Sequence, residues 1–401
     1  MTTVLISGAS VAGPALAYWL QRYGFTTTVV ERAPAPRAGG YAVDFRGASM
    51  KVLERMGILS EVEEEATRMG AMTYVKESGK VAATTSSEAF SGELEILRGD
   101  LVDILYNLTK SSTEYLFDDS IVSLGQDADG VDVVFESGMR GRFDLVIGAD
   151  GLHSNVRRLA FGAESSYIHH LGYYASVCTV ENHLDLDHTG QIFNVPGKTV
   201  GTYSARDNTE AKALFYFTSS DLKYDRRNVP AQKAIVEEQF KDLGWEVPTL
   251  LEGMRTAPDF YFDSISQIKL DSYSRGRIAL VGDAGYCASP LSGMGTSLAV
   301  VGAYVLAGEL HAAGGNHERA FAAYDVRMKD FVAACQKQAV DGAMWFIPAS
   351  KWFMKLRNLT FRMMPYLPWR NLIRDMSLKV GNAIELTTYE DLPVRPAAPR
   401  P

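Results

Sequence analysis

The sequence predicts an α/β fold in which a domain with a parallel sheet is interrupted by a mainly antiparallel sheet and followed by helices. An apolar run at residues 4–7 leads through a glycine turn into a helical pattern that begins near Pro14. Alternating segments such as residues 190–195 are typical of antiparallel strands. Residues 277–281 return to a buried apolar strand, and helical patterns dominate from residue 296. We therefore predict four segments: 1–163 and 271–330 for the two parts of the first domain, 164–270 for the inserted domain and 331–390 for C-terminal helices.

Further elements follow in order along the first segment. Residues 27–30 are β-branched and predict the second strand. The dipeptide Ser78-Gly79 marks the turn of a hairpin over residues 71–84. The remaining patterns predict a strand at 41–45, helices at 48–56 and 97–108, and strands near 114–117, 121–124, 131–135 and 142–148. In the inserted segment a helix is predicted at 231–242.

Composition limits the classes of function. The chain has 401 residues, 46% of them hydrophobic, and a net charge of −8, which argues against nucleic acid as a partner because phosphates need a basic face. Its three cysteines, Cys178, Cys287 and Cys335, are widely spaced and fit a reducing cytoplasm without a disulfide framework. Neither they nor the seven histidines form a metal motif. We expect a cytoplasmic protein with a small-molecule partner, of undetermined oligomeric state.

The first glycine turn is suited to a nucleotide phosphate. Gly8 permits the tight turn, and Gly13 lets the helix approach the strand. Ser10 and Ala12 are small, so the backbone between them stays accessible. Glu31 ends the next strand, at the distance along the chain where an acid binds a ribose diol. The pattern is typical of a Rossmann-like dinucleotide-binding domain.

A second segment far along the chain completes the pattern. Gly282-Asp283 follows a buried strand, and Asp283 needs a hydroxyl donor such as a ribityl chain supplies. Pro290, Gly293 and Gly295 follow in a loop with little side-chain cover, and the helix that starts near Thr296 presents its positive end there. The two segments together indicate an elongated dinucleotide such as FAD.

The order of these motifs resembles a known family. The Gly8–Gly13 turn, Glu31-Arg32, Arg98, residues 148–151 and Gly282-Asp283 are together similar to class A, single-component FAD-dependent monooxygenases. These have a para-hydroxybenzoate hydroxylase-like fold and include tetracycline-inactivating and polyketide-tailoring hydroxylases. The resemblance implies an FAD-binding domain, interrupted by the sheet that binds substrate.

The resemblance also implies roles for individual residues. Glu31 would hold the adenosine ribose and Arg98 the pyrophosphate side of FAD, while Asp283 would meet the ribityl chain. Asp150 belongs to a motif that serves both FAD and a transient NAD(P)H, and Val122 would meet adenine through its backbone. Arg46 lies where some relatives place an arginine near the flavin or the NAD(P)H phosphate.

The implied reaction is an FAD-dependent monooxygenation. NAD(P)H reduces FAD, O₂ adds at flavin C4a, and the hydroperoxide hydroxylates an aromatic or polyketide-like small molecule. No residue of the chain is assigned as catalytic, because the chemistry belongs to the flavin. Alternating aromatic residues of the inserted sheet predict the substrate contacts Tyr203, Arg206, Phe215 and Phe217.

Several alternatives remain at this stage. The same cofactor supports Baeyer–Villiger oxidation or epoxidation, and residues 344–348 superficially resemble the signature of flavin halogenases. A non-catalytic flavin- or ligand-binding protein and an NAD(P)-dependent dehydrogenase are further possibilities. The aromatic and basic segment from Trp345 to Arg374 is typical either of a helix that covers the active-site mouth or of weak contact with a membrane surface.

Overall fold

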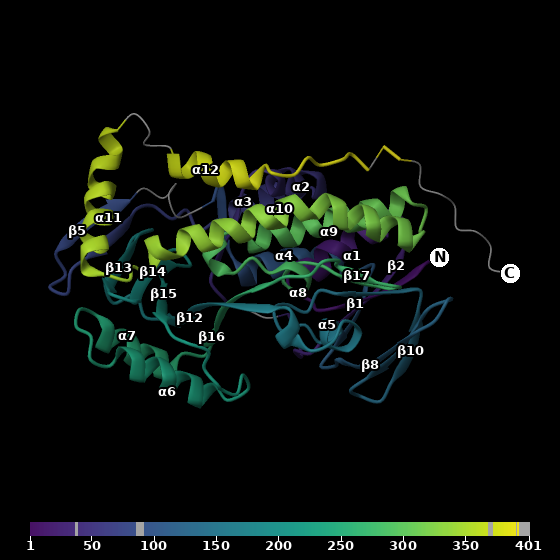
Figure 1. The fold of residues 1–401 in the computed structure, drawn as a ribbon, viewed down its shortest axis with the longest axis horizontal. Coiled ribbons are helices and arrows are strands. Elements are labelled where there is room, and N and C mark those ends of the chain that lie inside the picture. Colours follow the sequence, from purple (N-terminus) through teal and green to yellow (C-terminus); the bar gives the residue numbers. More distant parts are fainter. Residues whose placement is uncertain (37–38, 86–91, 368–371, 390, 393–401) are drawn as a thin grey trace.

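A six-stranded sheet forms the first domain of the computed structural model, which describes residues 1–36, 39–85, 92–367, 372–389 and 391–392 (Figure 1). The strand order is β17-β18-β11-β1-β2-β7, and all neighbours are parallel except β17 and β18. The predicted Rossmann-like core is therefore present. Its strands are β1 (Thr3–Ser7), β2 (Thr26–Glu31), β7 (Glu114–Phe117), β11 (Leu145–Gly148), β17 (Ser274–Arg275) and β18 (Ile278–Leu280).

Helices cover one face of this sheet, and a small sheet covers the other. Figure 1 shows the two longest helices, α9 (Gly295–Ala312) and α10 (His317–Phe346), running side by side. Residues 296–310 of α9 are all buried, which explains their lack of charge up to Glu309. No helix among the described residues has the length and apolar character needed to cross a bilayer. The other elements here are α1 (Ala12–Arg22), α2 (Ala48–Met56), α3 (Leu59–Glu64), α4 (Arg98–Thr109), α5 (Asn155–Ala160), β8 (Ile121–Gln126), β9 (Val131–Phe135), β10 (Arg140–Phe143) and the pair β3 (Ala42–Phe45) and β6 (Leu94–Leu97).

The second sheet has seven strands, in the order β16-β12-β15-β14-β13-β4-β5. Two of these strands, β4 and β5, precede the segment 164–270 that we expected to hold the inserted domain, and β4 pairs in parallel with β13. The helices α6 and α7 pack on one face, and the other face turns toward the first domain. The elements are β4 (Met72–Val75), β5 (Val81–Thr85), β12 (Ile168–Val180), β13 (Gly190–Val195), β14 (Lys198–Ala205), β15 (Glu210–Thr218), β16 (Tyr261–Ile268), α6 (Val229–Phe240) and α7 (Val247–Thr256).

One predicted strand divides in two. Residues 142–148 were expected to be continuous, but the chain turns at Asp144, between β10 and β11. The Asp144 carboxylate accepts hydrogen bonds from the backbone N–H of Thr3 (2.6 Å) and from its hydroxyl (2.8 Å). These bonds hold the turn beside β1, so β10 joins the small sheet while β11 enters the parallel sheet.

The C-terminal part is helical as expected. After α10 the chain forms α11 (Lys351–Met363), the short turn η4 (Met364–Tyr366) and α12 (Leu372–Gly381). In Figure 1, α11 stands at one end of the molecule beside β5. Residues 368–371, which belong to the aromatic and basic segment, lie outside the described residues.

Candidate cofactor and substrate site

The turn between β1 and α1 has the geometry expected of a phosphate-binding turn. Gly8 has a φ of +109°, and a Cβ there would lie 2.5 Å from the carbonyl oxygen of Ala149. A Cβ on Gly13 would lie only 1.9 Å from the carbonyl oxygen of Gly8, so α1 can approach β1 only with glycine here. No acidic side chain occupies the first turn of α1 and no side chain caps it. Its first N–H groups are therefore suited to an anion.

Arg98 reaches this turn from the start of α4. Its Nη1 lies 3.4 Å from the hydroxyl of Ser10. Its Nε is buried and has no hydrogen-bond partner among the described residues. A buried guanidinium nitrogen without an acceptor is unfavourable unless an anion or hydroxyl meets it. The residues present therefore fit a pyrophosphate between Arg98 and α1.

Glu31 lies on the opposite side of the same turn. Its carboxylate accepts hydrogen bonds from the backbone N–H groups of Ala9 and Ala33, both at 2.9 Å. The chain at Asp119 runs alongside, because its N–H donates to the carbonyl of Glu31. Val122 follows in β8 at a bulge, where its side chain is exposed. Arg32 is exposed next to Glu31.

The Asp283 segment closes against the same helix. Gly282 has a φ of +64°, and a Cβ there would lie 3.2 Å from the Cβ of Ala12 at the start of α1. The side chain of Asp283 is accessible, but the protein around it raises the pKa of the carboxyl group by burial, an effect that the charge of Arg98 partly offsets. Asp283 and Arg98 therefore face one enclosed space, although they are far apart in the sequence.

The loop after Asp283 leaves its backbone uncovered near the start of α9. The turn η3 (Pro290–Ser292) leads to Gly293, which has a φ of +60°, and α9 begins at Gly295. A Cβ on Gly295 would meet open space, and neither an acid nor a capping side chain occupies the first turn of α9. The start of α9 is one residue earlier than predicted and leaves a positive helix end uncovered.

Arg46 lies across from this loop. It forms an ion pair with Asp44 (3.3 Å), and both side chains lie within 4 Å of where a Cβ on Gly293 would be. Burial raises the pKa of Asp44, and the Arg46 cation opposes that effect. The structure thus brings Arg46 to the ring end of the candidate site rather than to the phosphate end.

Asp150 has a structural role in addition to the one predicted. Its carboxylate accepts hydrogen bonds from the backbone N–H groups of Asn155 (2.8 Å) and Val156 (3.0 Å) and from the hydroxyl of Ser154 (2.5 Å). Burial raises the pKa of Asp150, and these bonds lower it. It therefore caps α5, while the hydroxyl of Ser7, at 3.5 Å, places it beside β1.

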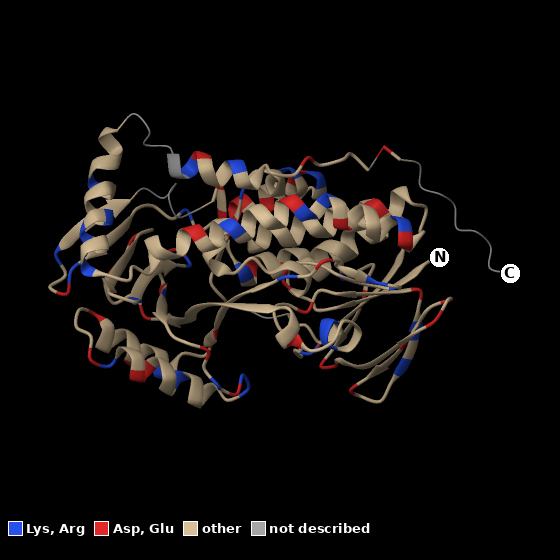
Figure 2. Ribbon diagram, viewed as in Figure 1, with Lys and Arg blue, Asp and Glu red and all other residues tan. Residues whose placement is uncertain are grey.

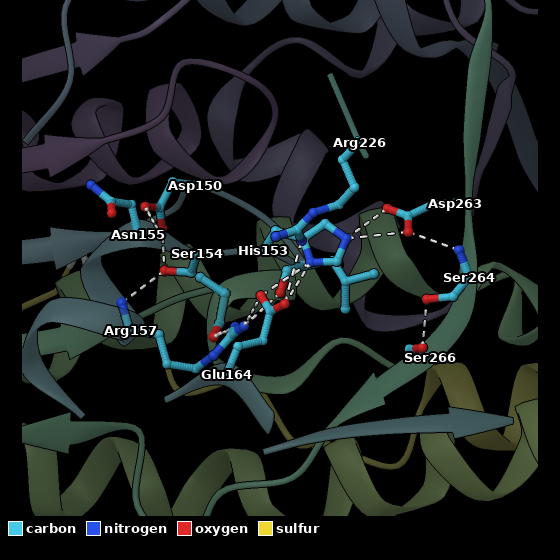
Figure 3. A network of polar contacts seen from close by, with 12 residues as sticks. Asp150, His153, Ser154, Asn155, Arg157, Glu164, Arg226, Asp263, Ser264 and Ser266 are labelled. Atoms are coloured by element: carbon cyan, nitrogen blue, oxygen red, sulfur yellow. Dashed lines mark hydrogen bonds and ion pairs between the residues drawn. The ribbon is translucent and has the colours of Figure 1, made fainter. Parts of the chain in front are cut away.

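A polar network that sequence reasoning missed extends from Asp150 (Figure 3). The His153 ring lies between Glu164 (3.0 Å) and Asp263 (2.9 Å), and it joins the first domain to β16 of the seven-stranded sheet. Burial alone would lower the pKa of His153, but the hydrogen bonds and charges of the two carboxylates outweigh it and raise the pKa. Arg157 is fully buried and donates to the carbonyl of Ala284 (2.7 Å), which fixes the Asp283 segment from behind.

Tyrosines from both domains lie near Asp283. The rings of Tyr41 and Tyr261 are 6.0 Å apart, and both hydroxyls lie close enough to Asp283 for its charge to raise their pKa values further, beyond the effect of burial. Burial raises the pKa of Tyr41 to about 12. Tyr216 packs edge-on against Phe346 at 4.9 Å. Tyr261 keeps 38% of its surface accessible despite the surrounding protein.

The predicted substrate residues do not all lie on this face. The Tyr203 hydroxyl accepts a hydrogen bond from the N–H of Ala42 (3.1 Å), so Tyr203 does face the first domain. Phe215 and Phe217 do not: both are fully buried on the opposite face, against Phe240 of α6. Alternation alone does not reveal which face of the sheet turns toward the first domain, so the sequence could not place Phe215 and Phe217 on the α6 side.

Arg206 is the fourth predicted substrate residue, and it lies at the outer turn between β14 and β15. It is partly exposed and forms an ion pair with Asp100 of α4 (2.9 Å). Its guanidinium connects the two domains at the surface. Tyr41, Tyr216 and Tyr261 replace Phe215 and Phe217 as the aromatic residues nearest to the site.

Comparison with known proteins agrees with this geometry. The sequence model described as "FAD binding domain" matches residues 1–339. The chain belongs to this family of flavin-dependent monooxygenases. A flavin-dependent monooxygenase of Legionella longbeachae is 44% identical over 96% of this chain and 98% of its own length. An uncharacterized protein of Mycobacterium tuberculosis is 50% identical over 83% of this chain and 91% of its own.

Solved structures lead to the same family. The crystal structure of tetracycline destructase Tet(51) superimposes with a TM-score of 0.85 and 37% identity, over 97% of this chain and 100% of that one. The fold and enzyme class expected from the sequence are thereby confirmed, and FAD is the cofactor of the family. Flavin supplies the redox chemistry of this enzyme, and the protein positions it.

Proposed function

We propose that this monooxygenase uses NAD(P)H and O₂ to hydroxylate a flat, polycyclic phenol or enol of the tetracycline or polyketide type. The observation that supports it is the set of Tyr216 and Tyr261, on the face of the seven-stranded sheet that turns toward the first domain, together with Tyr41 near Asp283. Aromatic rings with accessible hydroxyl groups bind flat molecules that carry several oxygens. Tet(51), whose name gives tetracycline as its target, has the same overall structure.

The phosphate end of FAD is held, in this proposal, by the turn after β1. The free N–H groups of α1 and the Nε of Arg98 would donate hydrogen bonds to the pyrophosphate oxygens. Glu31, which the N–H groups of Ala9 and Ala33 hold at the end of β2, would accept hydrogen bonds from a ribose diol. Val122 and Asp150 stay proposed contacts of adenine and of FAD or NAD(P)H.

The ring end is held by Asp283 and the start of α9. Asp283 accepts hydrogen bonds from ribityl hydroxyls, which compensate its burial. Pro290, Gly293 and Gly295 leave room along the ring edge, and the positive end of α9 stabilises negative charge on it. When bound, FAD accepts electrons from the nicotinamide donor and transfers one oxygen atom from O₂ to the substrate.

The tyrosines exclude water and orient the substrate. Tyr41 and Tyr216 are neutral at physiological pH, as tyrosines ordinarily are, and burial raises their pKa values further, so both would donate hydrogen bonds to the substrate. The neutral rings also keep charge away from the electron-rich carbon that reacts. Orientation of that carbon next to the ring is the main catalytic contribution of the chain itself.

A turnover assay tests the reaction. The purified protein, tetracycline and a panel of aromatic polyketides are mixed with NADH or NADPH, and cofactor oxidation and product mass are followed together. We expect oxidation to accelerate and the product to gain one oxygen atom without fragmentation. Acceleration without a gain in mass contradicts hydroxylation. A product with an inserted ester oxygen indicates Baeyer–Villiger oxidation instead, and an epoxide product indicates epoxidation.

A variant tests the cofactor site separately. Asp283→Ala removes the carboxylate and is expected to purify with little bound flavin. The exposed carboxylate of Asp271 gives a matched control, because Asp271→Ala changes charge equally outside the site. The ratio of absorbance at 450 nm (approximately the blue flavin band) to protein measures occupancy. Full occupancy in Asp283→Ala would remove Asp283 from the site.

A further inference from the structure

The C-terminal helices differ in charge from the rest of the molecule. Residues 342–374 contain six Lys or Arg and no Asp or Glu, although the whole chain has 48 acidic residues and a net charge of −8. In Figure 2, α11 at one end of the molecule carries blue segments and no red ones. The protein is therefore acidic overall, with one locally basic end.

One face of α11 packs onto the seven-stranded sheet. The guanidinium of Arg357 lies 4.1 Å from the ring centre of Tyr74 and donates to the side-chain oxygen of Asn194 (2.9 Å). Phe361, one turn later, is buried 5.4 Å from the same tyrosine ring. These contacts fix the helix, so its opposite face has a defined orientation.

That opposite face is apolar and exposed. At about 100° per residue, Trp352, Leu356, Leu359 and Met363 fall within an arc of roughly 60°, almost opposite to Phe361. All four are exposed, Trp352 to 71%. Tyr366, in the turn that follows, is 88% exposed. We call these five residues the outer stripe of α11.

Basic residues line one edge of the outer stripe. On the same helical projection Lys351, Lys355 and Arg362 lie together, roughly 70–110° from its centre. Both lysines are exposed, and the Nε of Arg362 donates to the carbonyl of Ala82 (2.6 Å). An apolar face with a cationic edge is the arrangement of helices that lie in a membrane interface.

We propose that α11 docks the enzyme onto an anionic lipid surface, with the outer stripe among the acyl chains and Lys351 and Lys355 at the headgroup phosphates. Charge complementarity favours this occupant. The remainder of the acidic protein is repelled by anionic lipid, so only the basic end can approach. A second copy of the chain would bring another cationic edge to the interface, whereas lipid phosphates neutralise it.

Docking in this way places the lipid beside the substrate face of the sheet. The link from α10 to α11 is attached to that sheet, because the hydroxyl of Thr199 donates to the carbonyl of Phe346 (2.8 Å) and the N–H of Gly197 to that of Pro348 (2.9 Å). Phe346 in turn packs against Tyr216. Apolar molecules dissolved in the bilayer would therefore be concentrated at the end of the protein that holds the tyrosines.

Vesicle sedimentation of the flavin-loaded full chain tests the proposal. Vesicles of phosphatidylcholine mixed with phosphatidylglycerol are compared with vesicles of phosphatidylcholine alone. The variant Trp352→Ser/Leu356→Ser removes two apolar side chains from the outer stripe. The variant Lys351→Glu/Lys355→Glu reverses the charge of two residues along its basic edge. Val326→Ser and Lys329→Glu are matched controls, because both residues are exposed on α10 and outside residues 342–374.

The expected results are specific. The wild type and both controls should bind the mixed vesicles, less so at high salt, and bind pure phosphatidylcholine weakly. Losing two interfacial lysine charges should weaken binding by roughly 30-fold or more. Equal melting temperatures and flavin content among the variants show that folding is not the cause.

Two results would overturn the proposal. One is that the wild type does not bind the mixed vesicles, or that Trp352→Ser/Leu356→Ser and Lys351→Glu/Lys355→Glu bind them as strongly as the wild type does. The other is a wild-type dimer in solution that becomes monomeric in Trp352→Ser/Leu356→Ser, which assigns the outer stripe to a second copy of the chain. Neither result bears on the monooxygenase reaction, which is measured without lipid.

Discussion

The two faces of the seven-stranded sheet are formed by the same strands but have different surroundings. On one face Phe215 and Phe217 are fully buried with Phe240 beneath α6. On the other, which turns toward the first domain, Tyr216 and Tyr261 lie close enough to Tyr41 to influence its hydroxyl, and Tyr261 lies near Asp283 as well. The closed face stabilises the fold through packing, and the open face carries the hydroxyl groups and ring edges that we propose bind the substrate. Adjacent residues of one strand thus serve stability and recognition separately.

The largest effect should come from the closed face. Phe215→Ala removes a fully buried ring and leaves a cavity, so we expect the free energy of unfolding to fall by about 3–5 kcal/mol. Urea denaturation measures this loss. The folded fraction should keep its substrate KM. A raised KM at unchanged stability would mean that Phe215 faces the substrate after all.

A smaller loss is expected where the open face meets the first domain. Tyr203→Phe removes the acceptor of the Ala42 N–H and should lower the unfolding free energy by about 1–3 kcal/mol. Tyr366→Phe is a suitable control, since that hydroxyl is at an exposed position and its loss should change nothing. Equal stability of the two variants would show that the hydrogen bond contributes little.

The open face should affect recognition more than stability. Tyr216→Ala removes a ring that packs against Phe346, and we expect kcat/KM for a polycyclic substrate to fall about tenfold. Tyr216→Phe retains the ring and should keep most of the activity. Steady-state kinetics on flavin-saturated protein separate this effect from cofactor loss. An unchanged kcat/KM in Tyr216→Ala places the substrate elsewhere.

The smallest expected effect is on the pH dependence of the unfolding free energy. It arises because His153 contacts Asp263 on the open face of the sheet. The folded state raises the pKa of His153 above its ordinary 6.5. The resulting stabilisation is fully present below pH 6.5 and is lost as the pH rises through the raised pKa. We expect unfolding free energies measured across this range to fall for the wild type and to fall less for His153→Gln. The exposed His169 provides the control, and His169→Gln should keep the wild-type slope.

Local patterns predicted the nucleotide end of the site well. A turn that needs Gly8 and Gly13, with Glu31 at the end of the next strand, is specified by neighbouring residues, and the structure brings these residues together. Arg98 and Asp283 are distant in sequence, and each opens a helix, but only Asp283 follows a strand that the sequence predicted. The roles of these residues toward FAD stay predictions.

The substrate end could not be predicted in the same way. Alternation along β15 shows that successive residues point to opposite faces of the sheet. Only tertiary packing decides that Tyr216, rather than Phe215, faces the first domain. Tyr41 follows a loop without a regular pattern and reaches the site because Arg98 N–H binds its carbonyl. The capping of α5 by Asp150 likewise depends on a helix of only six residues, too short for a periodic signal.

The parallel pairing of β4 with β13 bears on how new specificities can arise in such enzymes. A gene segment that covers residues 164–270 would transfer five of the seven strands and leave β4 and β5 behind. The β4–β5 hairpin of the recipient enzyme would then have to pair with the β13 strand of the donor enzyme. Recombination between relatives is therefore expected to succeed when the exchanged segment begins before β4, and point substitution on the tyrosine side offers the shorter evolutionary route.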